Sequence, residues 1–389
     1  MSGKNAIVMA GGGTGGHVYP MIAVAEAVRS LFAELRIVFV GTARGMETRA
    51  VPERGFELRL LDVVPIRGGG LGGALRGVAR AAQSIPEARA LLRELEPRAV
   101  FSIGGYAAGP IALAARTLGI PVALMEPNSV IGLANRLMAP LVARAYTAFP
   151  EAERHFAQSV VLRTGVPLRS GFSPRAYRRN KKFLRVLVLG GSQGAKALNE
   201  TVPDALARSK TPVEVVHRCG RGNDAGLAER YVGLGAKSRV SVVPFIDDMP
   251  SALAAAELVV GRAGASAVSE ICAVGRPSLL VPYPHAAGDH QRRNAESLQA
   301  AGAAVCVSSD EATAERIAAE IDRLAETPGL LERMAEAARE RGRPEAALAV
   351  ARDLLELSGA ERPQVATGSP GRAPDRGESG VRVVAQEGV

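Results

Sequence analysis

The amino-acid sequence predicts an α/β protein built from two doubly wound parallel-sheet domains that face each other across a cleft. The chain has 389 residues, which is long enough for two separate hydrophobic cores. Short apolar runs that end in glycine turns alternate with segments of helical apolar spacing, the pattern of repeated β-α units. Such a turn occurs at residues 11–16 and again at 190–194, about 180 residues later, which matches the spacing of two domains.

Composition narrows the kinds of partner. The formal net charge of +9 suits nucleic acid, anionic lipid or a phosphorylated substrate, and charge alone does not choose among them. Aromatic residues make up only 4% of the chain and Trp is absent, which disfavours base stacking, so no nucleic-acid partner is expected. Cys219, Cys272 and Cys306 are scattered without Cys-x-x-Cys spacing, which argues against a disulfide framework or a zinc site.

The first glycine turn follows an apolar run at residues 6–10 and leads into helical spacing at 21–28. The run at the N-terminus indicates a strand rather than a signal peptide. Gly11, Gly13 and Gly16 match the dinucleotide fingerprint, but the next strand, 36–40, ends in Gly41-Thr42 without the expected acid, which argues against a nicotinamide enzyme. His17 stands where a P-loop would need lysine.

Further β-α units follow the first. Residues 66–73 form a glycine-rich loop, and the arginine-flanked apolar spacing over 71–85 fits either an interfacial helix or an ordinary helix that faces the core. No apolar run reaches the roughly 18 residues that a membrane span needs, so membrane contact is expected to be peripheral. A strand at 99–103 runs into a further glycine-containing turn at 104–109, and a strand at 122–125 brings Glu126-Pro127-Asn128 to the carboxyl edge of the sheet.

Residues 160–179 are expected to link the domains, since loops with Pro and Arg replace the β-α pattern there. The second series has strands at 186–189, 213–217, 240–243, 258–260 and 278–281. Charged helices are predicted at 315–340 and 344–357, and residues from 359 onward lack periodicity, which predicts a disordered tail. We divide the chain into domains at 1–165 and 166–345, a closing helix at 346–358 and a tail at 359–389.

The turn at residues 261–264 is the strongest candidate for a ligand site. It places backbone N–H groups at a helix N-terminus, where a diphosphate binds well, and Gly264 allows close approach. Glu270, one helical turn further, can accept two hydrogen bonds from a ribose diol, and Arg262 adds a cation. The alternative is a helix start in which Glu270 only complements the dipole. Gln291 and Asn294 share a helix face and offer amides to a sugar, or form a solvated helix start.

Six motifs, in this order, resemble the MurG family of bacterial peptidoglycan glycosyltransferases. They are GGGTGGHVYP (11–20), SIGGYAAGP (102–110), GGSQG (190–194), FIDDM (245–249), RAGASAVSE (262–270) and QRRN (291–294), and the likeness covers residues 6 to about 357. The resemblance implies a GT-B fold and an inverting transfer of N-acetylglucosamine (GlcNAc) from UDP-GlcNAc to the 4-hydroxyl of the N-acetylmuramyl (MurNAc) sugar of undecaprenyl-diphospho-MurNAc-pentapeptide, lipid I. It also implies a C-terminal donor domain, an N-terminal acceptor domain on an anionic membrane surface, and a location on the cytoplasmic face of the bacterial inner membrane.

Carried over position by position, the resemblance implies that Glu270 holds the ribose, the backbone of 265–267 the diphosphate and Ile246 the uracil, with Gln291 and Asn128 on the sugar. The implied donor-binding residues are Thr14, Gly15, Gly16, Asn128, Arg169, Ser192, Ile246, Arg262, Ala265, Ser266, Ala267, Val268, Ser269, Glu270 and Gln291, and the acceptor-binding residues are Gly104, Gly105 and Tyr106. The chain departs from the family where Met125-Glu126-Pro127-Asn128 replaces His-Glu-Gln-Asn, and the loop 285–294 is one residue longer, so the Gln291 assignment depends on alignment from Asn294.

No Asp-x-Asp sequence occurs, which disfavours a metal-held diphosphate, and neither metal nor cofactor is expected. Helix N-termini and Arg262 would stabilise the leaving UDP instead. His17 is the preferred general base, because a helix N-terminus disfavours imidazolium, and Glu126 is the alternative. His17 equally fits a phosphate-binding or loop-orienting role. Rival functions are a UDP-GlcNAc 2-epimerase-like isomerase, which needs no membrane surface, and a non-catalytic nucleotide-sugar-binding subunit.

Overall fold

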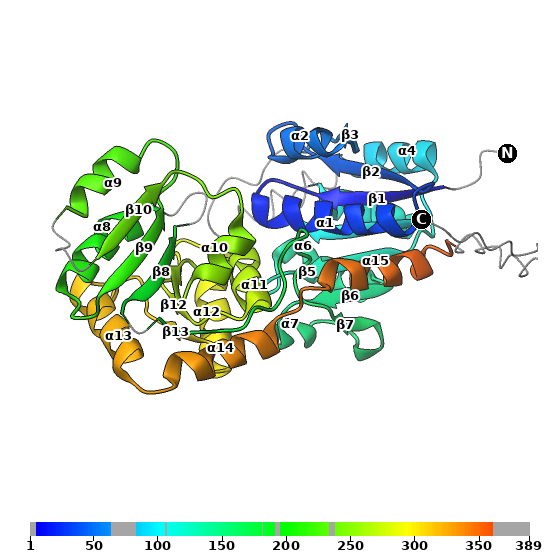
Figure 1. Ribbon diagram of the computed structural model, residues 1–389. Helices are drawn as coiled ribbons and strands as arrows, with labels where there is room; N and C mark the ends of the chain where they lie inside the picture. Colours follow the sequence, from blue (N-terminus) through cyan, green and yellow to red (C-terminus); the bar gives the residue numbers. More distant parts are fainter. Residues whose placement is uncertain are drawn as a thin grey trace, which may run out of the picture.

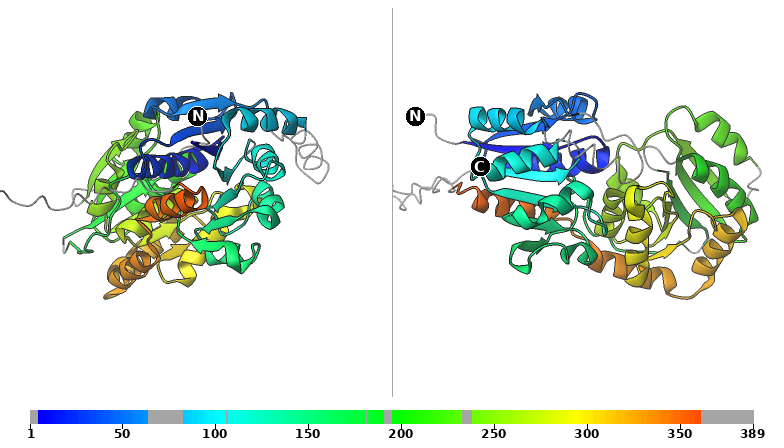
Figure 2. Two further views of the ribbon diagram at one scale, coloured as in Figure 1. Left: turned by 90° about the vertical axis from the view of Figure 1, so that its right-hand side faces the viewer. Right: turned by 180° about the vertical axis from the view of Figure 1, so that it is seen from behind.

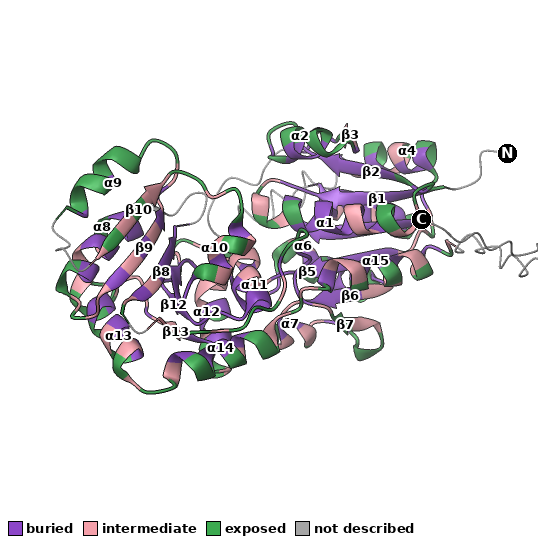
Figure 3. Cartoon of the chain, viewed as in Figure 1, coloured by how far each residue is buried: buried purple, intermediate pink, exposed green. Residues whose placement is uncertain are grey.

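The computed structural model describes residues 5–63, 83–105, 107–180, 182–190, 195–232 and 238–360, and every structural statement below refers to these. Two lobes, each built on a parallel sheet, lie side by side (Figure 1). Burial concentrates in the strands and in the inward faces of the helices (Figure 3). The predicted helix at 71–85 and the tail beyond 360 fall largely outside the described residues. Within the described part of the chain, no helix has both the length and the apolar content that crossing a bilayer requires.

The first sheet has seven parallel strands in the order β3-β2-β1-β4-β5-β6-β7. Its strands are β1 (Ala6–Gly11), β2 (Arg36–Gly41), β3 (Glu57–Leu60), β4 (Ala99–Gly104), β5 (Val122–Glu126), β6 (Arg144–Thr147) and β7 (Val161–Arg163). The helical segments are α1 (Gly15–Leu31), α2 (Glu47–Ala50), η1 (Pro52–Arg54), α4 (Ile85–Leu95), α5 (Ala108–Thr117), α6 (Leu133–Met138), η2 (Ala139–Leu141), α7 (Pro150–Glu153) and η3 (Gln158–Val160). β1, β4 and β5 are buried along their whole length, which explains their unbroken apolar runs.

The second sheet has six parallel strands in the order β10-β9-β8-β11-β12-β13, the strand order of dinucleotide-binding folds. Its strands are β8 (Leu184–Leu189), β9 (Val213–Arg218), β10 (Arg239–Val243), β11 (Leu258–Gly261), β12 (Ser278–Leu280) and β13 (Ala304–Cys306). The helical segments are α8 (Ala195–Arg208), α9 (Asp224–Arg230), α10 (Met249–Ala255), α11 (Ala265–Val274), η4 (Ala287–Asp289), α12 (His290–Ala300), α13 (Ala314–Glu326), α14 (Leu330–Arg341) and α15 (Ala346–Leu357). The predicted pair of doubly wound parallel sheets is therefore confirmed.

The last helix, α15, returns to the first lobe and packs against α1 (Figures 1 and 2). Val350 and Leu354 are buried in the core that α1 and the first sheet share. The hydroxyl of Tyr146 on β6 donates to Asp353 Oδ2 at 2.7 Å, and Arg144 Nε donates to Asp353 Oδ1 at 3.2 Å. The chain thus crosses between the lobes twice, once after β7 and once between α14 and α15.

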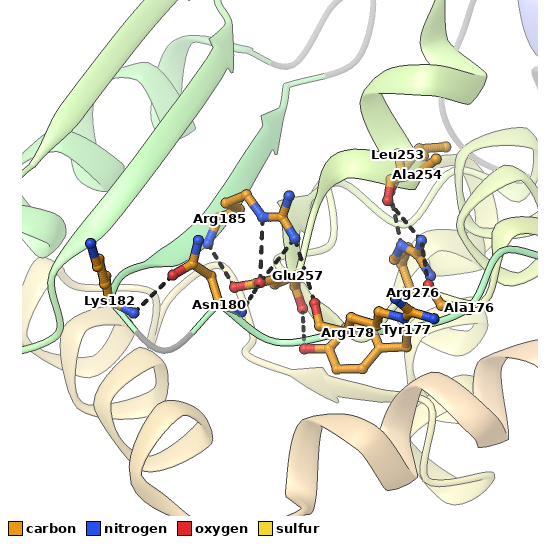
Figure 4. Close-up of polar contacts among 10 residues, drawn as sticks. All are labelled: Ala176, Tyr177, Arg178, Asn180, Lys182, Arg185, Leu253, Ala254, Glu257 and Arg276. Atoms are coloured by element: carbon orange, nitrogen blue, oxygen red, sulfur yellow. Dashed lines mark hydrogen bonds and ion pairs between the residues drawn. The ribbon is translucent and has the colours of Figure 1, made fainter.

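The expected linker at 160–179 is wrong at both ends. β7 lies within it and belongs to the first sheet. Its final part is fixed to the second lobe by Arg276, which is 2% exposed and donates to backbone carbonyls of three segments, and by Glu257, whose backbone carbonyl oxygen accepts from the Tyr177 hydroxyl at 2.9 Å (Figure 4). The carbonyls bound by Arg276 are those of Arg175, Ala176, Leu253, Ala254, Val274 and Gly275. The local sequence could not reveal this because Arg276 and Glu257 both come from the second series.

The two crossings touch each other. Gly165 has a φ of +80°, and a Cβ placed on it would lie 2.5 Å from the Cβ of Arg343. Only a glycine lets the first crossing pass this close to the second. The lobes are therefore joined by two covalent segments that run side by side.

Candidate active site between the lobes

The first glycine turn connects β1 to α1. Gly12 and Gly13 have φ values of +151° and +92°, which other residues rarely adopt. Thr14 is the N-cap residue with extended backbone, and the first turn of α1 contains no acidic residue. The structure thus places Thr14, Gly15 and Gly16 at an exposed helix N-terminus, with His17 in the same turn.

His17 is half-buried, and its Nδ1 lies 3.3 Å from the carbonyl oxygen of Gly12. Because a carbonyl can only accept, this contact places the proton on Nδ1 and leaves Nε2 as an acceptor. Burial lowers the pKa of His17 below its usual value, and nearby His290 lowers it further, while the Gly12 contact and Glu47 oppose the shift. The side chain is therefore neutral at physiological pH. The expectation of a neutral imidazole holds, although burial is the main cause.

Glu47, on α2, is a residue that the sequence analysis missed. Its carboxylate is 0% exposed and accepts hydrogen bonds from the Gly13 N–H at 2.8 Å and the Thr42 N–H at 2.9 Å. Dinucleotide-binding folds place the acidic residue that binds ribose at the end of the strand that corresponds to β2. Here the acid comes five residues after Thr42 and turns back to the glycine loop.

Two further loops complete the carboxyl edge of the first sheet. Gly104 and Gly105 have φ values of +93° and +91°, and a Cβ on Gly105 would lie 2.8 Å from the carbonyl oxygen of Gly12. The structure therefore brings these two expected acceptor residues against the first glycine turn. Tyr106, the third, lies outside the described residues.

Glu126 ends β5 and is 1% exposed. Its Oε1 accepts from the Asn128 N–H at 3.0 Å and from Asn128 Nδ2, while its Oε2 accepts from the Gly132 N–H at 3.0 Å and Asn135 Nδ2 at 2.9 Å. Burial raises the pKa of Glu126, and these donors oppose the shift. Both oxygens are already engaged, so this geometry favours a role in shaping the 126–132 loop over the expected alternative role as base.

The second glycine turn connects β11 to α11. Gly264 is the N-cap residue, and a Cβ placed on it would meet open space. The first turn of α11 contains no acidic residue, and the buried Ser266 Oγ has no hydrogen-bond partner among the described residues. Free N–H groups and a spare hydroxyl at one helix N-terminus can bind phosphate oxygens.

Arg262 has a different place from the one expected. It is buried, and its Nη1 donates to the carbonyl oxygens of Val281 and Pro282, each at 3.0 Å. Because the guanidinium supports the strand end after β12, this geometry argues against the predicted role as a phosphate-binding cation. The competition from carbonyls at 281–282 is not visible in the local sequence.

Glu270 lies one turn into α11, and its carboxylate forms no hydrogen bond with the described residues. Burial raises its pKa to about 7, against the opposing influence of Arg169 and Arg218. Arg218 was not predicted. It is the last residue of β9 and pairs with Leu189 at the end of β8. Leu189 in turn pairs with Gly261 at the end of β11, so Arg218 lies at the same edge of the sheet as the glycine turn.

The remaining expected donor residues are distributed around this edge. Ile246 packs on the apolar cluster that includes Leu168 and Phe172, next to exposed Arg169. Gln291 lies in the first turn of α12, and its Oε1 accepts from the Tyr283 N–H at 3.1 Å. Residues 265–269 form the first turns of α11. Ser192 lies outside the described residues.

Asn294, on α12, joins the two half-sites. It is fully buried, and its Oδ1 accepts from the Ser129 N–H at 2.9 Å and the Ser129 hydroxyl at 2.8 Å. Its Nδ2 donates to the Ala263 carbonyl oxygen at 3.1 Å and to Asn128 Oδ1 at 3.3 Å. All four bonds are internal, so the suggested contact between the Asn294 amide and a sugar is not supported, and Asn294 instead fixes the 126–129 loop against the second glycine turn.

One histidine and two cysteines away from these turns are buried within the second lobe. His217 is buried between the Tyr231 hydroxyl, 2.7 Å from Nδ1, and Asn199 Oδ1, 3.0 Å from Nε2. Cys219 and Cys272 are buried free thiols. Within the described residues no cluster of His, Cys, Asp or Glu could hold a metal ion.

Paired parallel-sheet lobes that each present a glycine turn characterise the GT-B class of glycosyltransferases. Two family models match accordingly: the glycosyltransferase family 28 N-terminal domain at residues 7–147 and the family 28 C-terminal domain at residues 185–350. A solved structure of MurG from Acinetobacter baumannii superimposes with a TM-score of 0.77 and 32% sequence identity, covering 90% of this chain and 99% of that chain.

Curated relatives narrow the class to one family. The protein from Sorangium cellulosum (strain So ce56) is 55% identical over 361 residues, which cover 92% of this chain and 89% of the relative. It is named "UDP-N-acetylglucosamine--N-acetylmuramyl-(pentapeptide) pyrophosphoryl-undecaprenol N-acetylglucosamine transferase". The chain belongs to this family, of which MurG is the usual short name. UDP-GlcNAc 2-epimerase from Neisseria meningitidis, bound to UDP-GlcNAc, shares the fold at a TM-score of 0.62 and 13% identity, covering 90% of this chain and all of that one.

The Asn294 contacts predict a specific defect. We expect Asn294→Ala to lower the free energy of unfolding by about 2–4 kcal/mol, because it removes four buried bonds and leaves the Ser129 and Ala263 groups without partners. Urea unfolding measures this change. The control is Arg293→Ala on the same helix, whose exposed ion pair with Glu296 contributes little. Equal free energies of unfolding for the two variants would contradict the conclusion that Asn294 holds the 126–129 loop against the second glycine turn.

Proposed function

We propose that this protein transfers GlcNAc from UDP-GlcNAc to the 4-hydroxyl of the MurNAc sugar in undecaprenyl-diphospho-MurNAc-pentapeptide, converting lipid I into lipid II for peptidoglycan synthesis. The observation that carries the proposal is 55% identity, over 92% of the chain, to a relative named for this reaction. The paired glycine turns and the Asn294 joint between them support it. The 2-epimerase alternative rests on a likeness of fold alone.

The donor occupies the second lobe in this proposal. The N-terminus of α11 binds the diphosphate, with the unpartnered Ser266 hydroxyl and the N–H groups of 265–267 as donors. Glu270 accepts hydrogen bonds from the ribose diol, Ile246 pairs with uracil through its backbone, and Gln291 and Asn128 contact the sugar. Arg169, which faces Glu270, and Ser192 lie near the nucleotide, and the N-terminus of α1 at Thr14, Gly15 and Gly16 approaches from the first lobe.

The acceptor hydroxyl enters from the first lobe, where Gly104, Gly105 and Tyr106 bind the acceptor. His17 Nε2 removes the proton as oxygen attacks the anomeric carbon and UDP departs from the opposite face, which inverts the configuration. The neutral state of His17 and its free Nε2 support this role. Glu126, whose oxygens are engaged, shapes the 126–132 loop instead.

The reaction is tested by transfer of labelled GlcNAc to a water-soluble lipid I analogue. We expect His17→Gln to lower kcat by about 10²–10⁴, the usual contribution of a general base, with little change in donor KM. The control is His155→Gln, at a histidine that follows α7 and lies near Arg136 and Arg154, and it should keep the wild-type kcat.

Three outcomes would contradict this account. An unchanged kcat in His17→Gln would remove His17 as base. UDP release that does not depend on the acceptor would favour an isomerase or a hydrolytic reaction, and binding of UDP-GlcNAc without turnover would favour a non-catalytic subunit.

The pKa of Glu270 predicts how donor binding depends on pH. A ribose diol donates to the ionised carboxylate, which predominates at a pH well above the pKa of about 7 and is lost as the pH falls through that value. UDP-GlcNAc affinity, measured by calorimetry between pH 5.5 and 8.5, should therefore fall as the solution is acidified. Glu270→Gln should weaken binding by about 10–100-fold and flatten this dependence. Glu315→Gln, at an exposed residue of α13, is the control, and a wild-type pH profile in Glu270→Gln would exclude the ribose contact.

We also propose that the protein acts at the cytoplasmic face of the bacterial inner membrane as a peripheral protein. Support comes from the net charge of +9 and from an exposed apolar stripe on α6 and η2, formed by Leu133, Leu137 and Leu141 at spacings of four residues. Arg136 and Arg154 line the adjoining surface. Anionic headgroups attract such arginines. The predicted interfacial helix at 71–85 stays a prediction.

Vesicle flotation tests this surface. Leu137 is 54% exposed. We expect Leu137→Glu to reduce flotation with anionic vesicles by at least about threefold, because it places a charge in the apolar stripe. Transfer to the water-soluble acceptor should be unchanged. Val232→Glu, at an exposed apolar residue of the second lobe, is the matched control. Equal flotation of both variants would reject the stripe as the membrane contact.

A further inference from the structure

The buried carboxylate of Glu47 has no part in the reaction described so far. It comes from α2, beyond the end of β2, yet lies beneath the first glycine turn. One oxygen accepts from the Gly13 N–H, and the other from the N–H and the hydroxyl of Thr42, at 2.9 and 3.2 Å. A buried carboxylate needs such partners, since burial without them would be costly.

Three glycines form the walls around this carboxylate. A Cβ on Gly12 would lie 2.2 Å from Glu47 Oε1, one on Gly45 2.0 Å from Oε2, and one on Gly41 2.5 Å from Cγ. Real Cβ atoms do not approach other atoms so closely. The space between the three glycines is therefore filled by the Glu47 carboxylate and leaves no room for a side chain on any of them.

One peptide group connects this carboxylate to the proposed base. The N–H of Gly13 and the carbonyl of Gly12 belong to the same planar unit. The N–H donates to Glu47, and the carbonyl faces His17 Nδ1. Gly105 packs against the same carbonyl from the other side. The orientation of this peptide therefore determines which imidazole nitrogen carries the proton.

The same contacts distinguish the first turn from a phosphate-binding loop. The Gly13 N–H, which would otherwise be available to an anion, is occupied by an internal carboxylate. A negative charge beneath the turn also repels a second anion. Both glycine turns precede a helix, but the first has a carboxylate bonded beneath it, whereas the second combines an open N-cap glycine with the Ser266 hydroxyl, which has no partner among the described residues.

We infer that Glu47 is a positioning residue for the reaction, which holds His17 in the Nδ1–H tautomer through the Gly12–Gly13 peptide so that Nε2 faces the acceptor hydroxyl. The inference rests on the proposed role of His17 as base. It adds a residue that contacts neither substrate.

The direct test is ¹⁵N NMR of the histidine side chains in the full-length wild type and Glu47→Gln. Gln can accept at one atom only, so its amide cannot replace both carboxylate oxygens. We expect Nδ1 of His17 to have the shift of a protonated nitrogen in the wild type, and the two nitrogen shifts to converge in Glu47→Gln. We expect kcat to fall by about 10–100-fold with donor KM within about twofold. Because the Glu47 charge raises the pKa of His17, the acidic limb of the pH profile should move to lower pH.

Glu47→Asp separates geometry from charge and remains informative if Glu47→Gln does not fold. The shorter side chain keeps its charge but cannot reach both N–H groups. We therefore expect the same change of tautomer and of kcat as in Glu47→Gln, with the acidic limb of the pH profile unchanged. The control is Glu53→Gln on η1, whose exposed side chain pairs with Arg49. It should leave tautomer, kcat and pH profile as in the wild type.

The outcomes separate this inference from the proposed function. Retention of the Nδ1–H tautomer and of kcat in both Glu47 variants would overturn the inference. If His17→Gln keeps full activity, the base role fails, yet the tautomer measured in the Glu47 variants still decides whether Glu47 positions the imidazole.

Discussion

The site depends on the hydrogen bonds of Asn294, which bind two half-sites into one. The first lobe supplies the 126–129 loop, and the second lobe supplies the turn before α11. A single buried amide on α12 contacts both: its oxygen accepts from Ser129 of the first lobe, and its nitrogen donates to Asn128 of the first lobe and to the carbonyl oxygen of Ala263 in the second. An Asn fits this position because it alone among small side chains offers two donors and two acceptors. The two loops that meet at this amide are thereby held against each other.

The two glycine turns show how one local motif serves two purposes. Each follows a central strand and opens a helix, as expected for a doubly wound sheet. Beneath the first lies the carboxylate of Glu47, whereas the second has an open N-cap glycine and a spare serine hydroxyl. The two turns therefore differ in the charge beneath them and in the polar groups that they leave unpartnered.

Much of this arrangement was predictable from sequence. Apolar runs that end in glycine predicted the central strands, and the glycines at 261–264 predicted the turn before α11, because these signals are local. The donor-binding role of that turn stays a prediction. Glu47 and Arg218 were missed since their relation to the site arises only when distant segments meet at a sheet edge. Arg262 was assigned to phosphate because the carbonyls that bind it come from after β12. The weakly apolar edge strand β3 and the three-residue strands β7 and β13 were too short or too exposed to show a pattern.

The contact between Gly165 and Arg343 has a mechanical consequence. Arg276 clamps the chain from Arg175 onward to the second lobe, and Asp353 fastens α15 to the first. Torsional freedom between the lobes is thus confined to about ten residues after β7 and to the short segment before α15. Because these segments lie against each other, they define one pivot line, and a swing about it would open the far side of the molecule while leaving the Gly165 side closed.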